Sequence, residues 1–137
     1  MDRGYDGVVF STVKTAVKAL RYEELYIRER NVYRRLHDRG IRALQGFRIP
    51  KLIAADDALR VVEMHIVSPP FVLDFAGASL DVRPDYPRDV QAAWQREKRQ
   101  QFGQRWPTVQ ALISAFAAEG IFLSDVKPGN VMFEEPK

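Results

Sequence analysis

Residues 124–130, with the sequence SDVKPGN, are the stretch on which the interpretation of the fold depends. Asp125, Lys127 and Asn130 bring a carboxylate, an ammonium group and an amide oxygen into one short loop. The same residues are also typical of an ordinary turn, because proline fixes φ and because glycine and asparagine tolerate left-handed backbone. This segment alone therefore leaves two alternatives open, a plain turn and a catalytic loop, and the upstream sequence must separate them.

The spacing of these three residues resembles the catalytic loop of protein kinases and their relatives, in which an Asp, a Lys and an Asn surround the transferred phosphate. The resemblance implies that Asp125 orients or deprotonates the acceptor hydroxyl. It also implies that Lys127 neutralises the γ-phosphate of ATP and that Asn130 holds Mg²⁺. The expected cofactors are therefore ATP and Mg.

Near the N-terminus, residues 4–10 (GYDGVVF) are similar to the second half of the kinase glycine-rich loop, G-x-x-G-x-V. Gly4 and Gly7 would let the main chain approach phosphates, and Val9 would cover the adenine with apolar surface. The pattern departs from the family at position 2, where Asp2 replaces the first expected glycine. An acid at that position is a poor neighbour for phosphate.

Residues 15–20 (TAVKAL) alternate in a way that predicts a β-strand, and they look like the V-A-I-K element of kinases. The resemblance implies that Ala16 lines the adenine pocket and that Lys18 holds the α- and β-phosphates.

The next segment, residues 23–38, is predicted to be a helix whose buried stripe contains Leu25, Glu29, Val32 and Leu36 at steps of four, three and four. A carboxylate on a buried stripe needs a partner, because an unpaired buried charge is costly to desolvate. The kinase resemblance implies that Glu29 pairs with Lys18. The alternative is an edge position for Glu29, with Arg28, Arg30 or Arg35 as its partner.

A hairpin is predicted after this helix, from a strand over residues 48–55, a turn at 56–58 and a second strand over 59–67. At its end, Glu63 and His65 lie in a segment that resembles a kinase hinge, whose main chain would hydrogen-bond the adenine edge. His65 and His37 have no companion cysteine and no metal-site spacing, so both are expected to be structural or surface residues.

Two prolines, Pro69 and Pro70, are expected to end the second strand, because neither can donate to a ladder. The rest of the chain is predicted to hold a loop-rich connection over residues 71–87, with turns at 76–79 and 83–87, and then two helices over residues 89–102 and 108–119. Residues 121–123 lead into the 124–130 segment, and a short strand is predicted over residues 131–133. The expected organisation is a nucleotide-binding part (1–67), a hinge and linker (68–88) and a partial C-terminal lobe (89–137).

Composition is consistent with one domain or two small lobes, because 137 residues with 46% hydrophobic content can bury a real core. The chain has no cysteine, no targeting signal and no run of 18 apolar residues, so a cytoplasmic protein without a membrane partner is expected. The net charge is +3, with basic residues concentrated at 28–48 and 96–105. These basic residues could bind phosphates, an acidic partner or nucleic acid, or they could form solvated helix faces. No nucleic-acid-binding motif accompanies them.

The sequence departs from the kinase pattern in two places. Leu123 and Ser124 stand where His-Arg would precede the catalytic Asp, and no D-F-G follows the loop within this chain. Asp74-Phe75-Ala76 looks like D-F-G but precedes the loop by about fifty residues, so it is not assigned that role. Glu134 or Glu135 would have to replace the second metal-holding group.

The sequence therefore predicts a kinase-like α+β fold: a small antiparallel sheet with one packed helix, followed by a truncated, mainly helical C-terminal lobe. The resemblance is strongest to small microbial and fungal-type serine/threonine kinase-like proteins. It implies a transferase that binds ATP and Mg²⁺ and phosphorylates a protein or small-molecule hydroxyl. Two alternatives remain: a catalytically inactive, pseudokinase-like module that binds a protein partner, and a basic domain that binds nucleic acid.

Overall fold

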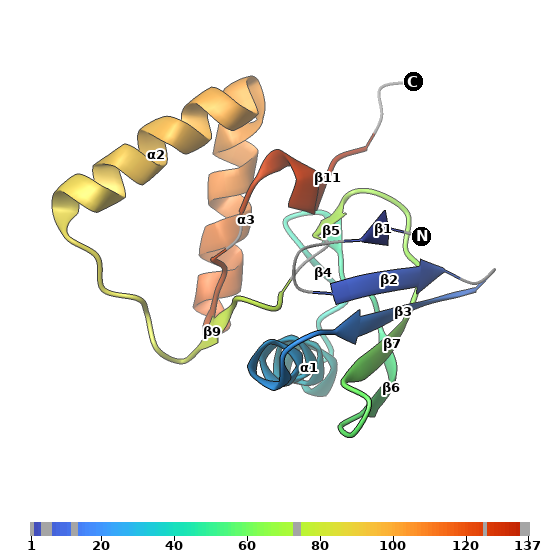
Figure 1. Ribbon diagram of the computed structural model, residues 1–137. Helices are drawn as coiled ribbons and strands as arrows, with labels where there is room; N and C mark the ends of the chain where they lie inside the picture. Colours follow the sequence, from blue (N-terminus) through green and yellow to red (C-terminus); the bar gives the residue numbers. More distant parts are fainter. Residues whose placement is uncertain (1, 4–6, 12–13, 73–74, 125, 135–137) are drawn as a thin grey trace.

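The computed structural model describes residues 2–3, 7–11, 14–72, 75–124 and 126–134, and for residues 2–3 and 7–11 it describes the main chain alone. The fold is mixed α+β, with antiparallel sheets at the N-terminal end and two long helices nearer the C-terminal end (Figure 1). None of the helices in these ranges is long and apolar enough to cross a membrane.

The largest sheet has five antiparallel strands in the order β1-β2-β3-β7-β6. The strands are β1 (Asp2–Arg3), β2 (Gly7–Ser11), β3 (Thr15–Leu20), β6 (Leu52–Asp56) and β7 (Val61–His65). Helix α1 (Glu23–Asp38) connects β3 to the later strands and packs against β3, β6 and β7 (Figure 1). The predicted strand at 15–20 and the predicted helix at 23–38 are therefore confirmed.

One face of this sheet is buried under α1. Lys18 and Leu20 on β3 and Val62 and Met64 on β7 are all buried, while the residues between them are half-buried or exposed. This alternation follows from the period of two in a β-strand, which sends successive side chains to opposite faces. Lys18 therefore lies on the apolar face of the sheet, directly opposite α1.

Helix α1 buries Tyr26, Glu29, Val32, Tyr33 and Leu36. Three of these belong to the predicted stripe, while the fourth predicted member, Leu25, is only half-buried. Tyr26 and Tyr33 extend the buried face, because positions three and four apart lie on one side of a helix. The helix ends before Gly40, whose φ of +67° is readily adopted by glycine.

The predicted hairpin is confirmed as β6 and β7, but its boundaries differ. Instead of one strand over 48–55, the chain forms β5 (Phe47–Arg48), leaves the ladder at Ile49-Pro50-Lys51, and enters β6 at Leu52. Proline cannot donate to a ladder, which explains the interruption. At the turn, the Leu59 N–H donates to the Asp56 side chain and Arg60 adopts a φ of +54°, so the second strand begins at Val61.

The predicted loop-rich connection, 71–87, contains two short strands, β8 (Phe71–Val72) and β9 (Ser79–Leu80), which pattern analysis missed. Strand β8 joins a four-stranded sheet of order β11-β8-β5-β4, with β4 at Ala43–Leu44 and β11 at Val131–Met132. Strand β9 pairs antiparallel with β10 (Ile121–Phe122). The turn expected at 83–87 is absent from this described segment, which runs without regular structure.

Both predicted C-terminal helices are present, as α2 (Arg88–Phe102) and α3 (Trp106–Ala118), joined by one 3₁₀ turn at Gly103–Arg105. Helix α3 buries Trp106, Val109, Leu112 and Phe116, whereas α2 buries only Lys98 and Phe102. In Figure 1, α2 accordingly flanks α3 on the outside of the fold.

Ion pairs connect α1 to the C-terminal half. Arg35 donates to both carboxylate oxygens of Asp81, at 2.7 and 2.6 Å, and Arg39 pairs with Glu119 at 2.7 Å. The buried apolar residues form one cluster that includes side chains of α1, the sheets and α3. The helix that carries Glu29 is therefore fixed to both parts of the chain.

The Asp81 carboxylate makes this connection sensitive to pH. The hydrogen bond from Arg35 holds the pKa of Asp81 below its ordinary value of 3.8. Its stabilising effect is therefore complete above that value and is lost as the pH falls through the lower pKa of the folded state. Asn tolerates the positive φ of 64° at this position, so Asp81→Asn removes the charge without backbone strain.

We expect Asp81→Asn to lower the melting temperature at about pH 5 to 7, and the difference from the wild type to shrink as the pH falls below about 4. Thermal melts across this range, followed by circular dichroism, measure the effect. Asp85→Asn, at an exposed position nearby, is the matched control. A difference that stays constant down to acid pH would contradict the role of the Asp81 carboxylate.

Candidate functional site

The centre of the candidate site is an ion pair between β3 and α1. The Lys18 ammonium group donates to Glu29 Oε1 at 3.0 Å, and the two residues are 8% and 0% exposed. This confirms the predicted partner of Glu29 and excludes the edge position with an arginine partner. Ala16 is half-buried on the same strand, two residues before Lys18, and therefore lies on the same face.

Glu29 has a second partner that the sequence did not predict. Its Oε2 accepts a hydrogen bond from the Phe75 main-chain N–H at 2.7 Å. The Phe75 ring is fully buried and makes edge contacts with Tyr33 of α1, at 5.2 Å between ring centroids, and tilted contacts with Phe116 of α3, at 5.5 Å. One carboxylate therefore binds both Lys18 and the chain segment that follows β8.

The segment at Phe75 faces the loop that contains residues 124–130. Strand β8 pairs with β11, and strand β9 pairs with β10. One loop joins β8 to β9 and the other joins β10 to β11, so each loop connects the same two strand pairs. Consistent with this, a Cβ atom added at Gly77 would collide with the Ser124 hydroxyl. The two loops therefore lie side by side, and Glu29 is hydrogen-bonded to one of them.

Residues 126–131 form a supported loop. Val126 and Val131 are buried at its two ends, Pro128–Asn130 form a 3₁₀ turn, and the Asn130 N–H donates to the Lys127 carbonyl at 2.9 Å. Lys127 is exposed and Asn130 is half-buried. Asp125 lies outside the described residues. Both ends of the loop are thus anchored in the core, while Lys127 between them is at the surface.

The glycine-rich segment is described only in part. Gly4 lies outside the described residues, whereas Gly7 and Val9 belong to β2, which pairs with β3. The register places Gly7 opposite Leu20 and Val9 opposite Lys18. The first residue of β2, Gly7, therefore lies at the end of the sheet where β3 leads into α1.

Glu63 and His65 do not point toward Lys18. Glu63 is opposite Val17 and His65 is opposite Thr15, so their side chains share the sheet face away from α1. The Thr15 hydroxyl donates to Glu63 at 2.9 Å, and the His65 N–H donates to the Lys51 carbonyl at 3.0 Å. The predicted hinge contact at His65 therefore cannot use this N–H without breaking its hydrogen bond to Lys51. His65 and His37 are both exposed, which agrees with a surface role.

The described residues offer limited support for a bound cation. No group of three or more His, Asp or Glu side chains in the described ranges is placed to hold a metal. Mg²⁺ in nucleotide sites commonly uses one or two carboxylates together with phosphate oxygens. Asn130 supplies an amide oxygen, and Glu134, four residues later, is exposed. Asn130 and Glu134 are therefore the candidate oxygen ligands at the end of the loop.

Comparison with known proteins adds no family to this description. The chain matches no protein-family model, no curated protein and no solved structure. The candidate site must therefore be interpreted from its own geometry.

Proposed function

We propose that this chain is a kinase-like protein that binds ATP with Mg²⁺ and transfers phosphate to a hydroxyl group. The observation that carries the proposal is the buried ion pair of Lys18 and Glu29. A second hydrogen bond, from the Phe75 N–H, also holds the Glu29 carboxylate in place.

A buried ion pair is weak evidence for a stabilising role, because apolar residues of similar volume often stabilise a core equally well or better. A buried lysine held by a carboxylate suits a different purpose, which is to present a fixed positive charge to a polyphosphate. The order β1-β2-β3-β7-β6, with one helix between β3 and the later strands, supports the same assignment, because it is a small antiparallel sheet with one packed helix.

In this proposal, Lys18 contacts the α- and β-phosphates, and Glu29 keeps its ammonium group in place. Gly4, Gly7 and the main chain between β1 and β2 approach the phosphates, while Val9 and Ala16 contact the adenine. When bound, Mg²⁺ would supply positive charge that neutralises the phosphates of the nucleotide. Lys127 adds positive charge at the γ-phosphate, Asn130 contributes an oxygen ligand, and Asp125 orients the acceptor hydroxyl.

The adenine edge requires a main-chain donor after β7. The His65 N–H donates to Lys51 and the Ile66 N–H donates to the Lys14 carbonyl. Within the described part of the chain, the Val67 N–H makes no main-chain hydrogen bond. Val67 is therefore the nearest donor after the strand that suits this contact.

We expect calorimetric titration of the purified chain with ATP to show binding that is strengthened by Mg²⁺. Lys127→Ala should weaken binding about tenfold or more, because a charge-assisted contact contributes about 1.5–3 kcal/mol. Asn130→Ala should remove most of the Mg²⁺ dependence. Arg34→Ala removes an exposed charge from α1 and is the matched control. Absence of binding at millimolar ATP would overturn the proposal.

The second candidate function is a pseudokinase-like module that binds a protein partner, favoured by Leu123 and Ser124 in place of His-Arg before Asp125. Phosphate transfer separates the two candidates. Under the leading proposal, Asp125→Ala abolishes transfer but leaves ATP binding in place. If the wild-type chain binds ATP·Mg²⁺ and transfers phosphate to neither water nor any tested hydroxyl, the pseudokinase-like function is correct.

A further inference from the structure

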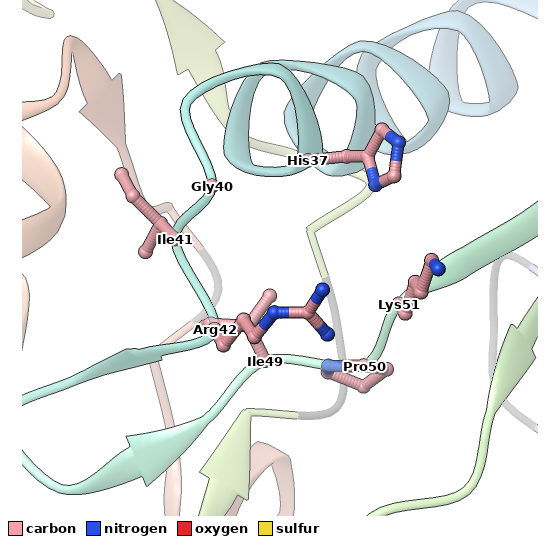
Figure 2. A pocket seen from close by; sticks show the side chains of 7 residues that line it. All are labelled: His37, Gly40, Ile41, Arg42, Ile49, Pro50 and Lys51. Carbon is pink, nitrogen blue, oxygen red and sulfur yellow. The ribbon is translucent and has the colours of Figure 1, made fainter.

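A small cavity lies at the C-terminal end of α1, away from the Lys18–Glu29 pair, with a volume of about 60 Å³. Three basic side chains from three segments line it: His37 from α1, Arg42 from the loop after α1, and Lys51 from the connection between β5 and β6. Figure 2 shows the Arg42 guanidinium group extending into the space between the His37 ring and Lys51. The remaining walls are Gly40 and the apolar residues Ile41, Ile49 and Pro50.

No acidic residue lines this cavity. The Arg42 and Lys51 side chains form no hydrogen bond or ion pair with any other residue in the described ranges. Four neighbouring arginines bind acceptors: Arg30 with Asp57, Arg35 with Asp81, Arg39 with Glu119, and Arg48 with the carbonyls of Ser68 and Pro69. Arg42 differs from these four because its guanidinium group faces a cavity instead of an acceptor.

The main-chain carbonyls at the C-terminal end of α1 do not repel an anion in this cavity. The last carbonyl groups of a helix carry partial negative charge when they are unsatisfied. In α1, the Arg35, Leu36 and His37 carbonyls accept hydrogen bonds from the N–H groups of Arg39, Ile41 and Gly40, at 3.1, 2.9 and 3.0 Å. The main-chain carbonyls beside the cavity are therefore occupied, and the unpaired charges at the cavity are positive.

We propose that this cavity binds a phosphoryl group, either as free phosphate or as the phosphate of a modified side chain. Its size excludes a nucleotide, because sites for ligands of that size have volumes of roughly 300–1,000 Å³. A single tetrahedral anion requires much less space. Arginine offers a planar fork that suits two phosphate oxygens, and lysine adds a point charge. The Gly40 main chain leaves the anion room to approach, because no side chain projects from it.

The test is a titration of the ¹⁵N-labelled full chain with inorganic phosphate at neutral pH and constant ionic strength, followed by amide NMR. We expect saturable shifts at residues 37–42 and 49–51. Arg42→Ala should weaken binding by about tenfold or more, since hydrogen bonds to charged groups are among the stronger ones. Arg42→Lys should recover only part of this loss, because it restores charge without the fork. Arg34→Ala, which removes an exposed arginine on α1, should leave binding unchanged.

The same chemical-shift changes should persist in Lys127→Ala, because Lys127 belongs to the proposed nucleotide site and does not line this cavity. Failure of one proposal can therefore be distinguished from failure of the other. A short phosphoserine peptide distinguishes the two sources of the phosphoryl group. Binding of the peptide at least tenfold tighter than phosphate supports a modified protein as the ligand, and equal binding supports free phosphate. Saturable shifts that are insensitive to Arg42→Ala, or no saturable shifts with either probe, would overturn the proposal.

Discussion

Lys18→Ala is expected to lower the free energy of unfolding by about 3–5 kcal/mol, because it leaves the Glu29 carboxylate buried without its cation. Glu29 is 0% exposed, and the Phe75 N–H that also donates to its carboxylate carries no charge. A neutral donor cannot replace an ammonium group. Urea denaturation followed by circular dichroism measures the loss.

The double variant Lys18→Met with Glu29→Met tests whether the loss arises from the unpaired charge. Replacing both charged groups with apolar side chains of similar length removes the desolvation cost of each, so the double variant should be more stable than Lys18→Ala. It should nevertheless fail to bind ATP under the proposed function. A loss below about 1 kcal/mol in Lys18→Ala would contradict the burial of the pair.

Much of the N-terminal half could be predicted from the sequence because its signals are local. Alternation over 15–20 gave the strand, and helical periodicity over 23–38 gave α1. The position of Glu29 on the buried stripe required a cationic partner, and Lys18 is that partner in the structure. A charged residue on a predicted buried face is thus a useful sequence signal, because the cost of desolvation requires a partner for the charge.

The second partner of Glu29 could not be predicted in the same way. The bond from the Phe75 N–H is a main-chain contact across 46 residues, and it depends on the pairing of β8 with β11. Each of these strands has two residues, which is too short for an alternating pattern to be recognised. The one available signal was Phe75 itself, a large apolar residue in a segment that was expected to be loop-rich.

The sheet face of Glu63 and His65 illustrates a different limit. The sequence indicated a strand here, but which residues face α1 depends on register with β3, which places Val62 opposite Lys18. A shift of one residue would exchange the faces. The main-chain acceptor of the His65 N–H, the Lys51 carbonyl, likewise depends on the interruption of the predicted strand at Pro50.

These contacts make Phe75 the point at which three parts of the fold meet. Its N–H donates to the carboxylate that holds Lys18, its ring packs against Tyr33 on α1, and the ring also contacts Phe116 on α3. Two residues further on, a Cβ atom at Gly77 would collide with the Ser124 hydroxyl, so the main chain at Gly77 lies close to that side chain. We therefore expect the position of the Lys18–Glu29 pair to be coupled to the loop at Ser124 through the segment that contains Phe75 and Gly77.

Phe75→Ala is accordingly expected to lower the free energy of unfolding by about 3–5 kcal/mol, the usual cost of removing a fully buried aromatic ring. Phe122→Ala, which removes a half-buried ring from β10, is the matched control and should cost less.

Phe75→Leu keeps most of the apolar volume and should fold at moderate cost, which allows binding to be measured. Since the main-chain N–H remains in Phe75→Leu, any loss of ATP affinity in that variant reports a change in the packing that positions Glu29. Urea denaturation gives the stabilities, and calorimetric titration with ATP and Mg²⁺ gives the affinities. If Phe75→Ala were no more destabilising than Phe122→Ala, the ring would not join α1 to α3, and the proposed coupling between the ion pair and the loop would be wrong.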